Sequence, residues 1–230
     1  MTISMLEERY YVKLLLSVIR GSILRRGGTP DAILNKDCFL DEEKAELLAI
    51  AEREGVKTHY FKRTNVLPRV RKVLGFLASV YPTNMLDVGS GRGAFLFPFI
   101  DEFPFCEVTS LELLESRAQM LADIERGGEV NLKVVEGDLC LYNAPDKFFD
   151  VVTILEVLEH IPNVKKAIAN AVRLAKNYVV VTVPSEEDDN PEHIHLLTRE
   201  KLTEYFNECG VYSLTFDGVV GHTVMIARIG

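Results

Sequence analysis

Apolar segments of strand length alternate with helical segments from about Thr83 to the C-terminus, and this alternation constrains the fold more than any other feature. Such alternation forms βαβ units, in which helices cover both faces of a parallel sheet. The sequence predicts five strands of this kind, at Met85–Val88, Glu107–Leu111, Leu132–Val135, Val151–Leu155 and Tyr178–Val183. The clearest helices between them are expected at about Gly93–Asp101, Glu115–Arg126 and Val164–Ala175.

The C-terminal end follows a different pattern. After a helix predicted at Thr198–Cys209, two strands at Val211–Phe216 and His222–Arg228 are joined by a short loop. Because so short a connection forms a hairpin, these two strands must be antiparallel. We therefore predict a doubly wound α/β fold with a mostly parallel sheet that ends in an antiparallel hairpin.

Three helical patterns precede this domain, at about Ile3–Leu24, Asp41–Arg53 and Pro68–Val80. Residues 1–80 hold 14 Lys and Arg and 10 Asp and Glu, hence +4, whereas the remaining 150 residues hold 12 and 24, hence −12. We predict that residues 1–80 form a helical cap that selects the substrate, and that residues 81–230 form the catalytic domain.

Several classes of protein are disfavoured by composition. No apolar stretch approaches the roughly 20 residues that cross a bilayer, and the N-terminus lacks a signal-peptide pattern. The four cysteines include no CxxC pair, so neither a disulfide framework nor a zinc motif is indicated. We expect a cytoplasmic protein. The net charge of −8 makes a long nucleic acid an unfavourable partner.

A local basic segment leaves a shorter anionic partner open. Residues 57–72 hold six Lys and Arg and no acid, with Tyr60 and Phe61 among them. Such a segment could bind a phosphorylated or nucleotide-like substrate, and a solvated helix face is the alternative. The expected substrate is a small molecule or a terminal nucleotide.

The strongest motif is a glycine-dense turn after the first strand of the α/β domain, in the segment Met85-Leu-Asp-Val-Gly-Ser-Gly-Arg-Gly93. Glycines at Gly89, Gly91 and Gly93 would let the backbone turn sharply and approach a ligand closely. The pattern alone also satisfies a loose dinucleotide-binding motif, G-x-G-x-x-A.

Asp87 distinguishes these two possibilities. Its carboxylate precedes the first glycine by two residues and would face a dinucleotide pyrophosphate at an electrostatic cost. It would instead suit a cationic ligand, such as the amino or sulfonium group of S-adenosylmethionine (SAM). The alternative is that Asp87 only caps the glycine loop.

Two further acids follow the next strands. Glu112, about twenty residues beyond the glycines, can accept hydrogen bonds from both ribose hydroxyls of a nucleoside, unless it is a solvated acid at a helix start. Asp138 can accept from an adenine amino group, and Leu139 can offer an apolar wall, unless the Gly-Asp pair forms an ordinary turn.

Asp87–Gly93, Glu112 and Asp138 at this spacing resemble the class I SAM-dependent methyltransferases, over about Thr83–Gly230. The resemblance implies a seven-stranded sheet with one reversed strand. It also implies Asp87, Gly89 and Gly91 near the methionine end of SAM, with Gly93 in the same loop, Glu112 on the ribose, and Asp138 and Leu139 on the adenine. One departure is visible, because Ala175-Lys-Asn-Tyr replaces the family's usual Pro-Gly-Gly turn.

A cluster of acids and histidines follows the fourth and fifth strands of the domain. A single helical turn at Glu156-Val-Leu-Glu-His160 would place Glu156, Glu159 and His160 on one side, and His193 and His195 follow on a later loop. These five residues form a candidate divalent-metal set. The alternative is that Glu156 and His160 pack around the cofactor without metal.

The E-x-x-E-H pattern with a later histidine resembles the metal-dependent small-RNA 3′-terminal ribose 2′-O-methyltransferases and is similar to the ubiquinone-biosynthesis O-methyltransferases. The longer pattern also resembles one that is widespread among methyltransferases of unassigned substrate. We therefore expect methyl transfer, preferably to oxygen. His160 is the first candidate for general base, because imidazole titrates near neutral pH, and Glu156 is the second. A nicotinamide-dependent oxidoreductase and a non-catalytic SAM-binding module stay as alternatives.

Overall fold

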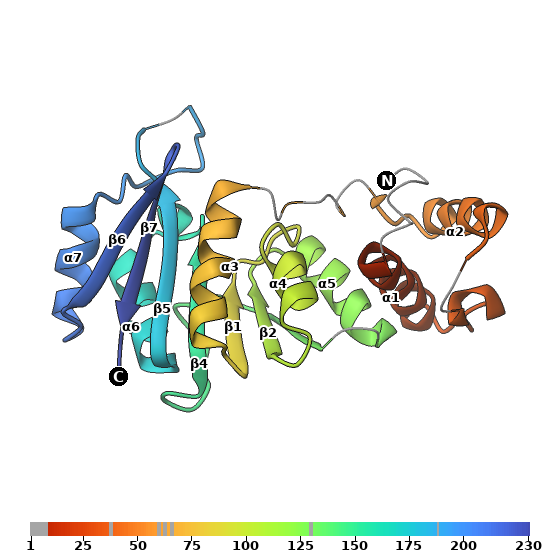
Figure 1. Ribbon diagram of the computed structural model, residues 1–230, viewed down its shortest axis with the longest axis horizontal. Helices are drawn as coiled ribbons and strands as arrows, with labels where there is room; N and C mark the ends of the chain where they lie inside the picture. The colour runs from red at the N-terminus through yellow and green to blue at the C-terminus, as the bar shows by residue number, and fades with distance from the viewer. Residues whose placement is uncertain are drawn as a thin grey trace.

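The computed structural model describes residues 9–36, 39–58, 61, 64, 67–128, 131–187 and 189–230. Within these residues the chain forms one seven-stranded sheet with helices on both faces (Figure 1). The strands are β1 (Asn84–Val88), β2 (Glu107–Glu112), β3 (Leu132–Glu136), β4 (Phe149–Leu155), β5 (Ala175–Pro184), β6 (Ser213–Val219) and β7 (His222–Arg228).

The strand order is β3-β2-β1-β4-β5-β7-β6. Strands β1 to β5 pair in parallel, β7 pairs antiparallel with β5, and β6 pairs antiparallel with β7. Six described strands therefore share one direction and β7 is reversed. The predicted fold class, with its C-terminal hairpin, is confirmed.

Helices cover the two faces in separate groups because successive strand residues point to opposite sides. Met85 and Val151 belong to a core shared with α3 (Pro68–Val80), α4 (Leu96–Glu102) and α5 (Glu115–Gly127). Their chain neighbours Leu86 and Val152 belong to a second core, shared with α6 (Val164–Leu174) and α7 (Arg199–Glu208). This two-sided burial makes the fold doubly wound.

The helix after the glycine turn begins later than predicted. It was expected from Gly93, but α4 begins at Leu96. Gly93 has a φ of +77°, in the left-handed region, so its backbone cannot belong to a right-handed helix. The glycine loop is therefore longer than the sequence pattern indicated.

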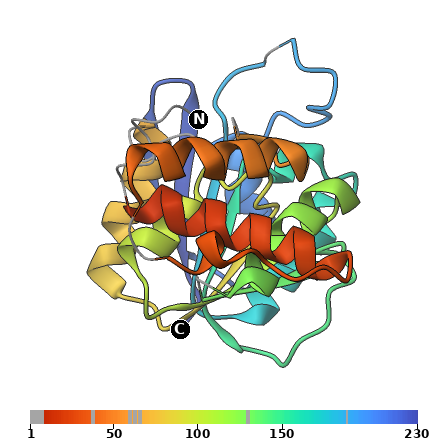
Figure 2. The same ribbon diagram turned by 90° about the vertical axis from the view of Figure 1, so that its right-hand side faces the viewer.

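At the N-terminus, α1 (Arg9–Arg25) packs along α5, and α2 (Asp41–Arg53) lies beside α1 (Figures 1 and 2). A short 3-10 turn at Ala32–Asn35 connects the two helices. Residues 3–8 of the first predicted helix lie outside the described residues. No helix among the described residues is long and apolar enough to span a membrane.

The contact between α1 and α5 depends on glycine. A Cβ added to Gly21 would lie 1.8 Å from the backbone oxygen of Asp123, and one added to Gly127 would lie 2.0 Å from that of Ser17. The two backbones therefore approach more closely than any side chain at these positions would allow. Arg25 closes the contact, because its Nε and Nη2 donate to the Asp123 carboxylate at 3.0 and 3.1 Å.

Candidate functional site

The carboxyl ends of the parallel strands border two neighbouring cavities, as expected for an open α/β sheet. The strand-end cavity, about 370 Å³, is lined by residues that follow β1 to β4, among them Glu112, Asp138 and His160. The glycine-loop cavity, about 190 Å³, is lined by Asp87, the glycine loop and the start of α3. Gly89 and Glu156 line both. The fold thus brings together candidate residues from four separate strand ends.

The glycine loop adopts a backbone that other residues rarely adopt. Gly89, Gly91 and Gly93 have φ of +65°, +59° and +77°. A Cβ on Gly89 would also lie 2.4 Å from a methyl carbon of Val157. Glycine at these positions is required by the backbone conformation, and at Gly89 also by close approach to Val157, whereas the approach of the loop to a ligand stays a prediction.

Asp87 is buried, with 2% of its surface exposed, at the floor of the glycine-loop cavity. Its carboxylate accepts hydrogen bonds from the hydroxyls of Thr153 at 2.7 Å and Ser90 at 2.6 Å. Burial raises the pKa of Asp87 to about 6, although the two hydroxyls oppose this shift. Among the described residues its donors are hydroxyls rather than loop N–H groups. The sequence analysis identified neither Ser90 nor Thr153.

Glu112 joins the end of β2 to the glycine loop. Its carboxylate is 3% exposed and accepts from the backbone N–H groups of Gly91 at 2.8 Å and Leu114 at 3.0 Å. It is therefore not a solvated acid. Each carboxylate oxygen keeps a further lone pair with which it can accept from a hydroxyl in the strand-end cavity.

Asp138 and Leu139 form another wall of the strand-end cavity. Asp138 accepts from the backbone N–H of Cys140 at 2.8 Å, so it also stabilises the turn that follows β3. Leu139 is 3% exposed and supplies apolar surface.

Glu156 departs from the expected helical turn. It has a φ of +58°, and only Leu158–His160 form a short 3-10 turn, so the prediction of one helical turn holding all three side chains is wrong. The Glu156 carboxylate accepts from the Thr182 hydroxyl at 2.6 Å, and its other oxygen lies 2.9 Å from Nδ1 of His222.

His222 is a site residue that the sequence analysis missed. It is the first residue of β7 and lies opposite Pro184, the last residue of β5. No local motif surrounds it, because its position depends on how the C-terminal hairpin pairs with β5.

Glu159, His160 and His193 form a compact group. One potential ligand atom from each lies within 4.8 Å of the others, and the two rings stack edge to face with centroids 4.8 Å apart. Glu159 is fully buried, and Nδ1 of His160 lies 2.9 Å from the backbone oxygen of Glu192. Glu156 and His195 do not belong to this group. Nε2 of His195 instead lies 3.1 Å from the backbone oxygen of Ile161.

Residues 86–181 match a protein family described as a methyltransferase domain. The matched segment extends from β1 into β5 and contains the strand ends that border both cavities. This match favours methyl transfer over the nicotinamide-dependent alternative. No protein with a curated description matches the sequence.

Three solved structures illustrate the likeness in fold. A SAM-dependent methyltransferase from Aquifex aeolicus is 19% identical, with a TM-score of 0.55, over 70% of this chain and 89% of that one. The N-terminal domain of EvdMO1 with S-adenosylhomocysteine (SAH) bound is 15% identical, with a TM-score of 0.55, over 70% and 81%. The methyltransferase domain of bacterial CtHen1 is 17% identical, with a TM-score of 0.56, over 70% and 97%.

At these identities the structural likeness shows only that the folds are alike. The evidence for a methyltransferase domain is the family match over residues 86–181. Together with the fold, the match shows that the chain contains a methyltransferase domain and that this domain has the fold of SAM-dependent methyltransferases.

Proposed function

We propose that this chain is a SAM-dependent methyltransferase, and that it methylates an oxygen atom of a small molecule or of a terminal group such as a terminal nucleotide. The observation that carries the proposal is the position of Glu156, which lines both cavities and lies beside His222. A hydroxyl acceptor must lose a proton during transfer, and groups able to take up that proton lie at this point. Bound SAM supplies a methyl group activated by its positively charged sulfur, so the protein must align the acceptor and exclude water.

The residues that we propose for SAM binding have the chemistry that the cofactor requires. Burial raises the pKa of Asp87 to about 6, and a cationic amino or sulfonium group nearby would favour its ionised form. Glu112 would accept from the ribose hydroxyls, and Asp138 and Leu139 would contact the adenine. Gly89, Gly91 and Gly93 would let the loop backbone approach the methionine end.

His160 is our first candidate for the general base. Its Nδ1 faces a backbone carbonyl, which requires an N–H there, so the neutral ring carries its lone pair on Nε2. That nitrogen would accept the acceptor's proton. Glu156 is the second candidate, and Thr182 and His222 would then hold its carboxylate in place.

A divalent metal is a separate part of the proposal. One carboxylate and two imidazoles suit Zn²⁺, Mn²⁺ or Fe²⁺ better than Mg²⁺. Ligand atoms around zinc lie about 3.4 Å apart when its bonds are about 2.1 Å, so the group of Glu159, His160 and His193 would have to contract. Glu156 or His195 would have to turn to join it. A metal there would lower the acceptor's pKa and so remove the need for His160 as general base.

We further propose that residues 1–80 shape the substrate side of the enzyme. Arg69 and Val70 at the start of α3 line the glycine-loop cavity. These contacts support a substrate-selecting role for the segment.

The test uses SAM labelled with ¹³C in the transferred methyl group and a panel of hydroxyl, amine and carbon acceptors. We expect the product methyl carbon to resonate in the O-methyl region of the NMR spectrum. An N-methyl or C-methyl signal would refute the oxygen target. SAH binding without turnover of any acceptor would favour the non-catalytic SAM-binding module.

A further inference from the structure

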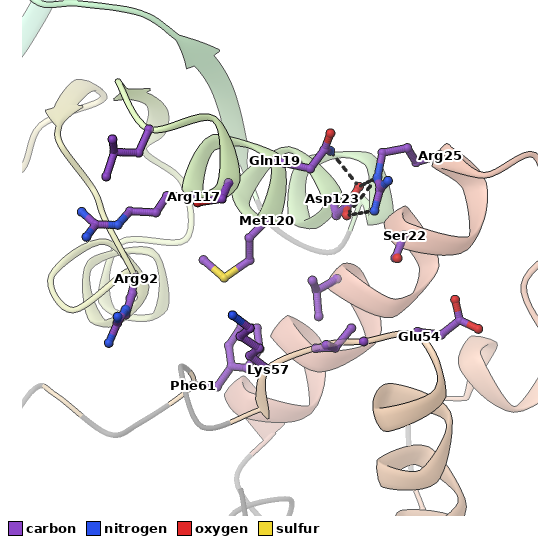
Figure 3. A pocket seen from close by; sticks show the side chains of 15 residues that line it. Ser22, Arg25, Glu54, Lys57, Phe61, Arg92, Arg117, Gln119, Met120 and Asp123 are labelled. Carbon is purple, nitrogen blue, oxygen red and sulfur yellow. Dashed lines mark hydrogen bonds and ion pairs between the residues drawn. The ribbon is translucent and has the colours of Figure 1, made fainter.

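A third cavity lies outside the methyl-transfer site. This α1–α5 cavity, about 480 Å³, is enclosed by α1, the segment that follows α2, the glycine loop and α5 (Figure 3). Its apolar wall is formed by Val18, Val56, Phe61 and Met120. Its size falls in the range of small-molecule sites, about 300–1,000 Å³. Neither Glu156 nor His160 lines it, so a molecule held there would not reach the proposed acid–base groups.

Cationic side chains gather at the end of this cavity next to the glycine loop. Arg92 and Arg117 lie there, and Lys57 lies nearer the middle of the cavity (Figure 3). Within the described part of the chain, the Arg117 guanidinium takes part in no hydrogen bond or ion pair. It is half-buried and lines all three cavities. A half-buried guanidinium without an anionic partner favours an anion from outside the protein.

The two carboxylates that line the same cavity already have cationic partners. Asp123 accepts from Arg25 at 3.0 and 3.1 Å and from Arg126 at 2.8 Å, and Gln119 also donates to it. Glu54 pairs with Arg26 and lies 3.6 Å from Arg53. The Arg25–Asp123 pair lies at the end opposite Arg92 and Arg117 (Figure 3). The cavity thus has paired carboxylates at one end, an apolar middle, and at the other end the Arg117 guanidinium, for which neither of these carboxylates is a partner.

We propose that the α1–α5 cavity is a second ligand site, which binds an organic anion with an aromatic or apolar body, such as an aryl phosphate. The anionic group would lie between Arg92, Arg117 and Lys57, because guanidinium groups bind phosphate and carboxylate with two parallel hydrogen bonds. The body would contact Met120 and Phe61. An aromatic ring there would meet sulfur and aromatic surface, which both favour it.

Occupancy of this site is coupled to the cofactor. Arg117 and Leu114 line both the α1–α5 cavity and the strand-end cavity. The backbone N–H of Leu114 also donates to Glu112, the proposed ribose acid, at 3.0 Å. A ligand that orders Arg117 would therefore change the affinity for SAH, and SAH would change the affinity for that ligand by the same factor.

Calorimetric titration of phenyl phosphate and 1-naphthyl phosphate into the full chain tests this site, both without ligand and with SAH at saturation. We expect one molecule of either aryl phosphate per chain with SAH bound. Inorganic phosphate lacks the aromatic body and phenol lacks the anionic group, so each should bind at least tenfold more weakly. Binding should weaken as the salt concentration rises.

Three variants test separately whether binding depends on the charge of the α1–α5 cavity and on its shape. Arg92→Gln and Arg117→Gln should each weaken aryl phosphate binding at least tenfold, because each removes a charge-assisted contact. Met120→Trp keeps every charge but fills the cavity, and it should abolish binding while SAH still binds. Arg228→Gln, which removes an arginine on β7, is the matched control and should bind like the wild type.

Two results would overturn the proposal. One is the absence of saturable aryl phosphate binding to the wild type with SAH bound. The other is binding that all three cavity variants retain. SAH affinity is measured in the same samples, so a failure of cofactor binding is distinguished from a failure of the second site.

Discussion

Replacement of Gly21 by alanine tests whether α1 belongs to the folded catalytic unit. The added Cβ would lie 1.8 Å from the Asp123 backbone oxygen, and ordinary contact begins at 3.4 Å, so the helices must separate by the difference, about 1.6 Å. A gap of 0.5–1 Å already loses about a quarter to a half of a dispersion contact. The buried face of α1, which includes Leu14, Leu15 and Ile19, would lose such contacts along its length.

The magnitude follows from two opposing effects. Overpacking costs about 1–3 kcal/mol and occasionally more, and the lost contacts along α1 place this site at the upper end. Alanine is favoured over glycine within a helix by about 1 kcal/mol, which opposes the loss. We expect the free energy of unfolding to fall by about 2 kcal/mol.

Urea unfolding followed by circular dichroism measures this change, and Gly75→Ala is the matched control. Gly75 lies within α3, and a Cβ there would meet nothing within 4 Å. That control should gain about 0.5–1 kcal/mol from helix propensity alone. If Gly21→Ala proves as stable as Gly75→Ala, the close packing of α1 on α5 is refuted.

Three further predictions concern the site. SAH at 100 times its dissociation constant should stabilise the fold by about 2.7 kcal/mol. Glu112→Ala should weaken SAH binding at least tenfold in a direct titration, and an unchanged affinity would show that Glu112 does not bind the cofactor. Because burial raises the pKa of Asp87 from 3.8 to about 6, the native state is favoured at low pH, and this stabilisation is lost as pH rises from about 4 to about 6. The ligand-free wild type should therefore lose up to about 3 kcal/mol relative to Asp87→Asn over that range, and parallel unfolding profiles would refute the shift. If a metal acts at Glu159, His160 and His193, chelation should abolish turnover and added Mn²⁺ or Zn²⁺ should restore it, whereas full activity in excess EDTA with no metal by elemental analysis would leave His160 as the base.

The sequence predicted the strands and the position of the site because both follow from short-range patterns. Apolar runs determined the strands from β1 to β5, and a parallel sheet necessarily brings the residues after those strands to one edge. Asp87, Glu112 and Asp138 could therefore be grouped without knowledge of any distance. The glycine loop was predictable for the same reason, since its three glycines are adjacent in the chain.

The direction of the Glu156 side chain could not be predicted in this way. The spacing of Glu156, Glu159 and His160 suits a helical turn, but a left-handed backbone at Glu156 turns its carboxylate toward β5 and β7. Such a conformation is uncommon outside glycine and is maintained by the surrounding structure. The partners that maintain it, Thr182 and His222, are distant in the sequence and meet Glu156 only through the pairing of β5 with β7.

The packing of the N-terminal helix α1 could not be predicted from the sequence either, and this packing affects the candidate site. The helical pattern of α1 indicated an apolar face but not what would cover it, and Gly21 and Gly127 carry no pattern that links them across more than a hundred residues. Their close approach lays α1 along α5, and this contact encloses the α1–α5 cavity beside the glycine loop. Arg117 lies on α5, the helix that α1 covers, and it also lines the strand-end cavity together with Glu112 and Asp138. A change in how α1 packs on α5 would therefore displace Arg117 and, through it, alter the strand-end cavity, where we propose that the methyl group is transferred.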